Sequence, residues 1–143
     1  MANIVELRGM SQEKLSEMLE ETRKEMFNLR FRRASGQLED YSRLKVARRE
    51  IAQIETVLHM RKLAIDAASS TPEIAAAIND QDEWNARAHF DYESSEWLVD
   101  FMDDKGKSFA SATVNLNKKQ PKSRRDVSRL GQPQAVTSYE VTG

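Results

Sequence analysis

Residues 27–54 read FNLRFRRASGQLEDYSRLKVARREIAQI, and this stretch contains the turn between two helical patterns. Ser35 and Gly36 end the first pattern, because glycine readily adopts the left-handed conformation through which a chain leaves a helix. The second pattern starts between Asp40 and Ser42. Cations gather on both sides of this turn, namely Arg30, Arg32, Arg33, Arg43, Lys45, Arg48 and Arg49. The stretch therefore predicts a helical hairpin with a positively charged tip.

Apolar spacing predicts two long helices that face each other. The first begins near Ser11, whose hydroxyl can cap free backbone N–H groups, and runs to about Ala34. Its apolar stripe consists of Leu15, Met18, Leu19, Thr22, Met26 and Leu29, beside a ridge of Phe27 and Phe31. The second helix carries a seam with coiled-coil spacing, formed by Leu44, Ala47, Ile51, Ile54 and Leu58. We therefore expect a mainly α fold with a long antiparallel two-helix hairpin over residues 1–65.

The net charge of −1 hides blocks of opposite sign. Residues 1–65 hold 13 Lys and Arg against 10 Asp and Glu, residues 66–104 hold 1 against 11, and residues 105–129 hold 8 against 1. These blocks carry net charges of +3, −10 and +7. A single globular domain more often intermixes its charges, so the separation indicates different partners for different segments, with nucleic acid favoured for the positive ones.

The motifs FNLR, SGQL and LKVARREIAQI occur in this order and resemble the family of the universal large-subunit ribosomal protein number twenty-nine, in its bacterial form. The resemblance covers residues 1–65, where it implies two long antiparallel helices. It also implies a structural role in translation, through binding to large-subunit ribosomal RNA near the exit of the nascent-peptide tunnel. Asp40 and Tyr41 depart from the family pattern, which more often has small polar or amide residues there.

The resemblance implies that residues around the turn contact RNA. Without it, charged side chains flanking a helical seam would be interpreted as a solvated face. Arg48 and Arg49 lie off the seam, so they can meet phosphates without disturbing helix packing. Gly36 is expected first to terminate a helix and second to permit close approach of RNA. The expected RNA-binding residues of the hairpin are Arg8, Arg30, Arg32, Arg33, Gln37, Arg43, Lys45, Arg48 and Arg49.

Residues 66–117 differ in character from the hairpin. Residues 66–82 are predicted to form a linker with a short helix, Pro72–Asn79, because proline suits the first helical turn. Residues 83–117 are acidic yet rich in aromatic residues, and alternation around Asp104–Gly106 predicts a possible β-hairpin. Three explanations remain for this segment: a self-packed module, a docking surface for a basic ribosomal neighbour, or a cover over the second helix.

Residues 118–143 are expected to form a basic, irregular, extended tail. Such a tail cannot bury a core, but it can become ordered on a phosphate-lined surface. Without the ribosomal context it could equally be a solubilising tail. Its expected RNA-binding residues are Lys118, Lys119, Lys122, Arg124, Arg125 and Arg129.

The sequence contains none of the common catalytic or nucleotide-binding motifs and no cysteine, so we predict neither an enzyme nor a cofactor. His89, Asp91 and Glu93 alternate, but one histidine with carboxylates is a weak metal signal. No apolar run of about 18 residues and no secretory or transit pattern occurs, which predicts a cytoplasmic protein without a membrane span.

The function predicted is that of a structural, RNA-binding constituent of the large ribosomal subunit. Its expected partners are large-subunit ribosomal RNA, the neighbouring protein number twenty-three, and chaperones or targeting factors at the tunnel exit, with no small-molecule substrate. The alternative is a coiled-coil adaptor that binds protein helices through the Leu44–Leu58 seam without RNA. Arg61 argues against the adaptor, because it interrupts this seam before Ile65.

Overall fold

A computed structural model describes residues 3–117, 123–125 and 135–142. The chain divides into two compact units, Met1–Met60 and Arg61–Gly143, and the boundary falls inside one long helix. Among the described residues, no helix combines the length and the apolar character needed to cross a membrane.

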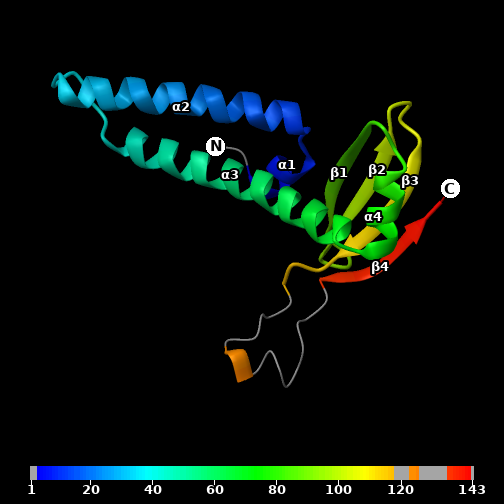
Figure 1. The fold of residues 1–143 in the computed structure, drawn as a ribbon. Coiled ribbons are helices and arrows are strands. Elements are labelled where there is room, and N and C mark those ends of the chain that lie inside the picture. The colour runs from blue at the N-terminus through cyan, green and yellow to red at the C-terminus, as the bar shows by residue number, and fades with distance from the viewer. Residues whose placement is uncertain (1–2, 118–122, 126–134, 143) are drawn as a thin grey trace. The chain divides into compact units, whose positions relative to one another are not determined.

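The first unit contains α1 (Ile4–Gly9), α2 (Gln12–Ala34) and the first part of α3 (Ser42–Ser69). Within this unit α2 and α3 run in opposite directions, as Figure 1 shows, which confirms the predicted antiparallel hairpin. The Oγ of Ser11 accepts a hydrogen bond from the backbone N–H of Lys14 at 3.3 Å, so α2 starts and ends where the sequence predicts.

Helix α1 was not expected from the sequence. Asn3 forms a capping box: its Oδ1 accepts from the N–H of Val5 at 3.4 Å, and its own N–H donates to Glu6 Oε2 at 3.2 Å. The backbone N–H groups of Asn3 and Val5 would otherwise lack a partner at the helix start, and the two side chains supply one to each. This pairing stabilises a helix of one to two turns.

Two apolar clusters hold the hairpin together. One lies towards the turn and contains Met26, Leu29, Leu38, Leu44 and Ala47; the other contains Leu7, Leu15, Ile54 and Val57. The two predicted stripes therefore do face each other, although Val57 is buried where Leu58 was expected to be, and Leu58 only packs against the cluster. The ridge of Phe27 and Phe31 stays outside both clusters.

The turn between α2 and α3 has the predicted glycine termination. Gly36 has a φ of 74°, and the N–H of the next residue, Gln37, donates to the Arg32 carbonyl at 2.8 Å. On the far side of the turn, Asp40 Oδ1 accepts from the Ser42 hydroxyl at 2.6 Å and from the Ser42 N–H at 2.9 Å. These hydrogen bonds, with the nearby positive charge of Arg43, hold the pKa of the Asp40 carboxyl below its ordinary value.

The second unit begins with the end of α3 and continues into α4 (Pro72–Asn79), whose bounds agree with the prediction. The predicted linker is wrong over residues 66–69, because α3 extends to Ser69. Ala64 and Ala68 explain the extension: they lie one turn apart on the helix and both are fully buried. Packing of this alanine face outweighs the linker-like composition of the segment.

A four-stranded antiparallel sheet completes the second unit: β1 (Trp84–Asp91), β2 (Glu96–Asp103), β3 (Ser108–Val114) and β4 (Val136–Val141), paired in sequence order. The predicted hairpin corresponds to β2 and β3, and its turn contains Gly106 with a φ of 82°. Strands β1 and β4 were not expected from the sequence. The prediction of an irregular tail is wrong for residues 136–141, which pair with β3.

One face of the sheet forms the core of the second unit. Trp97, Val99 and Phe101 of β2 are buried there, and the ring centroid of Trp97 lies 5.3 Å from that of Phe90 in β1. Helix α4 contacts β3 and β4 (Figure 1), and interaction with the Glu73 carboxylate raises the pKa of the Tyr139 hydroxyl above its ordinary value. Such internal packing favours the first of the three explanations for the aromatic segment, a self-packed module.

Candidate nucleic-acid interface

The cations predicted to bind RNA come from two elements that meet at the hairpin turn. The last turn of α2 carries Arg32 and Arg33, two and three residues after Arg30, and the start of α3 carries the others. All have exposed side chains, namely Arg30, Arg32, Arg33, Arg43, Lys45, Arg48 and Arg49. Cations at the C-terminal end of a helix also stabilise its dipole, so Arg32 and Arg33 have a structural use besides any ligand.

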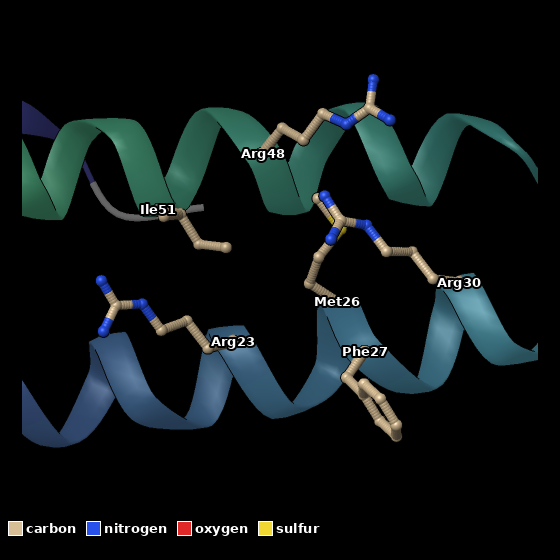
Figure 2. A pocket seen from close by; sticks show the side chains of 6 residues that line it. All are labelled: Arg23, Met26, Phe27, Arg30, Arg48 and Ile51. Carbon is tan, nitrogen blue, oxygen red and sulfur yellow. The ribbon is translucent and has the colours of Figure 1, made fainter.

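A pocket of about 410 Å³ lies between α2 and α3 and brings Arg30 and Arg48 to one place. In Figure 2, Met26 and Ile51 point into the gap between the helices and give the pocket an apolar floor. Arg30 extends from α2 towards α3, whereas the ring of Phe27 points away from α3. The arrangement can hold an anionic group at its rim and a flat apolar group against its floor.

Arg23 also lines this pocket, and it was not among the residues predicted from the sequence. Its position seven residues before Arg30 places both on the same side of α2, because seven residues make nearly two helical turns. That spacing was the signal that could have identified it. The Arg23 guanidinium pairs with Glu55 of α3, so this arginine links the two helices as well as lining the pocket.

Arg43 is engaged in an ion pair, since its Nη2 lies 3.4 Å from Oε1 of Glu25. About half of each side chain of the pair is exposed to solvent, 53% for Arg43 and 50% for Glu25. Exposed pairs of this kind contribute only about 0–1 kcal/mol, so a phosphate can replace Glu25 at little cost.

The other residues predicted to bind RNA lie apart from the pocket or cannot be placed. Arg8 lies on α1 and interacts with another group of the chain. The exposed Gln37 belongs to the turn between α2 and α3. Arg124 and Arg125 are exposed and likewise interact with other groups. The remaining tail residues, Lys118, Lys119, Lys122 and Arg129, lie outside the described residues.

His89, Asp91 and Glu93 alternate along β1 and the turn after it, which raises the question of a metal site. Within residues 3–117, 123–125 and 135–142, no group of three or more His, Asp or Glu side chains is placed to hold a metal ion. The candidate site of the described chain is therefore cationic and apolar in character, which suits a polyanion.

Comparison with known proteins bears on the same region. The sequence model of the family described as "Ribosomal L29 protein" matches residues 5–61. A protein of Thermobifida fusca, described as large ribosomal subunit protein uL29, is 53% identical over 60 residues, which are 42% of this chain and 71% of that protein. Proteins of the same description from Mycobacterium ulcerans and Saccharopolyspora erythraea are 46% and 43% identical over 68 and 72 residues.

These alignments cover 48% and 50% of this chain and 85% and 90% of the two relatives. The family match ends at residue 61, so the sheet of the second unit lies beyond it. The match contains the hairpin, its turn and the pocket, and it confirms the resemblance of the FNLR, SGQL and LKVARREIAQI motifs. Because this chain spans most of each relative at such identity, it belongs to the family of ribosomal L29 proteins.

Proposed function

We propose that this chain is a structural constituent of the large ribosomal subunit and that its hairpin binds ribosomal RNA. The observation that carries the proposal is the set of exposed cations on both sides of the turn, within the part of the chain that matches the family. The names of its relatives support the assignment to the large subunit. The protein acts by binding and positioning, in the cytoplasm where ribosomes work, and carries out no catalytic step.

The geometry of the tip supports a contact with phosphates. Arg30 extends from α2 towards α3, and Arg48 lines the same pocket from α3, so one anionic strand can contact both helices (Figure 2). Arg49 follows Arg48 on an exposed face, and both lie off the packed seam. Guanidinium groups can bind phosphate oxygens in pairs, and each phosphate neutralised releases counterions.

A place near the exit of the nascent-peptide tunnel, beside protein number twenty-three, is the part of the proposal that rests on the family resemblance. Chaperones and targeting factors that work at this exit are then further partners. The acidic and aromatic second unit lies outside the family match, so its partner need not be RNA. Within it, residues 66–104 carry a net charge of −10, which would repel phosphates and makes a basic protein the better neighbour of this segment.

The proposal is tested with Arg48→Glu combined with Arg49→Glu in the full-length chain. Binding to a large-subunit RNA fragment should weaken at least tenfold, and the slope of log affinity against log salt should fall by about 1.4–1.8, because two arginines no longer neutralise phosphates. Far-ultraviolet circular dichroism should show unchanged helix content, because both side chains are exposed.

A matched control separates local binding from net charge. Lys14→Glu with Lys62→Glu makes the same change of charge at exposed positions away from the turn, and it should bind nearly as well as the wild type. In a sucrose gradient of cell lysate, tagged wild-type chain should travel with the large subunit and the arginine variant should not. A wild-type chain that travels only with other proteins would support the adaptor alternative instead.

A further inference from the structure

Two phenylalanine rings stand exposed on α2, next to the pocket. Phe27 is 70% exposed and Phe31 is 66% exposed, although phenylalanine is usually buried. The residues are four apart, so their side chains are neighbours on one face of the helix. Among the described residues, neither ring packs against another aromatic ring. We call this pair the phenylalanine ridge.

Single exposed apolar residues are common, but two adjacent rings on one helix face form a patch that indicates a binding partner. The sequence shows why these rings do not enter the hairpin core. Met26 and Leu29 occupy the positions facing α3 and are buried, whereas Phe27 lies one residue further around the helix. Figure 2 shows its ring directed away from α3.

The surroundings of the phenylalanine ridge identify the chemistry of the partner. Lys24 lies three residues before Phe27, and Arg30 lies three residues after it, so cations border the rings along the helix. Phe27 is itself one of the residues that line the pocket, together with Arg23, Arg30 and Arg48. A partner that offers only apolar side chains would bring no negative charge to these arginines. An RNA strand offers both flat aromatic bases and phosphates.

Bases inside an RNA helix cannot reach the rings, because both of their faces are covered by neighbouring base pairs. Bases in loops, bulges and single strands have open faces, and proteins commonly stack aromatic side chains on them. The spacing of the two rings, one helical turn, suits successive stacking along a single strand. Unpaired nucleotides therefore match the phenylalanine ridge better than a duplex does.

We propose that Phe27 and Phe31 form a stacking platform for unpaired RNA bases, with phosphates of the same strand held by Arg30 and Arg48, which line the neighbouring pocket. The inference rests on the proposed function, because it specifies which kind of RNA the hairpin takes. It adds a ligand class and two residues that the charge pattern of the chain does not indicate. The arginines supply affinity for any phosphate chain, and the rings supply the preference for unpaired bases.

The test uses the full-length chain and two RNA probes, a short single strand that carries 2-aminopurine and a blunt duplex of the same length. Wild-type protein should bind the single strand and quench its 2-aminopurine fluorescence by stacking. Phe27→Leu with Phe31→Leu keeps apolar, helix-forming side chains but removes the rings. We expect this variant to bind the single strand more weakly by about 5- to 150-fold for each base that no longer stacks, with little quenching. Its affinity for the duplex should fall much less.

Phe27→Tyr with Phe31→Tyr is the matched control, because it keeps both rings and should retain affinity and quenching. The inference is overturned if the leucine variant binds and quenches the single strand like the wild type, since the ridge would then serve an apolar protein surface. It is also overturned, with the proposed function intact, if wild-type protein binds the duplex but not the single strand. If wild-type protein binds neither probe, both proposals fail.

Discussion

Replacing Gly36 by alanine should destabilise the hairpin without weakening its binding to RNA. Gly36 has a φ of 74°, and a Cβ built on it meets no atom within 4 Å, so the cost is backbone strain alone. The left-handed conformation costs an L-residue about 1–2 kcal/mol, and alanine restricts the unfolded chain by about 0.4–1 kcal/mol in compensation. The net destabilisation is about 1 kcal/mol, which lowers the melting temperature of so small a unit by about 4–8 °C.

The free energy of unfolding should be measured by urea titration followed by helical circular dichroism. Gly9→Ala is the matched control, because Gly9 also has open space around it but no positive φ, and it should be neutral or slightly stabilising. Gly36→Asn should lie between the wild type and Gly36→Ala, since asparagine visits the left-handed region more readily than alanine does. RNA affinity is measured in parallel, at a temperature where all variants are folded.

One result would refute this reasoning, namely a Gly36→Ala variant that unfolds like the wild type yet binds RNA tenfold more weakly. Glycine would then be needed for close approach of the RNA backbone, and termination of α2 would be a secondary role. The opposite result, lower stability with RNA affinity within a factor of about two, would assign Gly36 to the fold alone.

Three other predictions concern packing and ionisation. Ile54→Ala should cost about 2–5 kcal/mol in urea unfolding, because Ile54 is fully buried, whereas Val46→Ala at an exposed site should cost little; equal costs would contradict the observed seam. The pKa of Asp40 is lower in the folded chain than its unfolded value of about 3.8, so its carboxylate stabilises the fold at higher pH. This stabilisation should be lost as pH falls below 3.8 and through the folded pKa. An NMR titration that gives an ordinary pKa for Asp40 would contradict the hydrogen bonds from Ser42. Tyr139 should titrate with a pKa above 10.0, and its contribution to stability should disappear as pH rises through that pKa; Glu73→Gln should bring the pKa back down.

The hairpin could be predicted because its signals are local. Ser11 and Gly36 mark the ends of α2 through hydrogen bonds within a few residues, and the apolar stripes repeat with the period of a helix. The extension of α3 to Ser69 was harder to predict. Ala67, Ala68 and Ser69 look like a linker when taken by themselves, and only the burial of Ala64 and Ala68 shows why they stay helical.

A strand of the sheet could be predicted only where the strand that it pairs with follows closely in the sequence. The turn at Gly106 connects β2 and β3 directly, so alternation on both sides was visible. Strand β4 pairs with β3 in a register that joins Ala112 to Tyr139, and no local signal fixes a pairing over that separation. Composition also misled, because the basic residues before β4 made the whole segment resemble an unstructured tail. The few residues of β4 itself carry one charge, Glu140.

The cations of the tip show a different limit of sequence reasoning. Spacing could tell which charges lie off the packed seam, but it could not tell which are already paired. Arg43 pairs with Glu25 and Arg23 pairs with Glu55, both across the helices, so these ion pairs depend on the register of α2 against α3. Arg30 and Arg48 belong together only because the same register brings them to one pocket. Since exposed pairs contribute little, RNA can break the Arg43 pair, and Glu25→Gln should therefore raise RNA affinity slightly and not lower it. A fall in affinity after Glu25→Gln would mean that Glu25 positions Arg43 for its ligand.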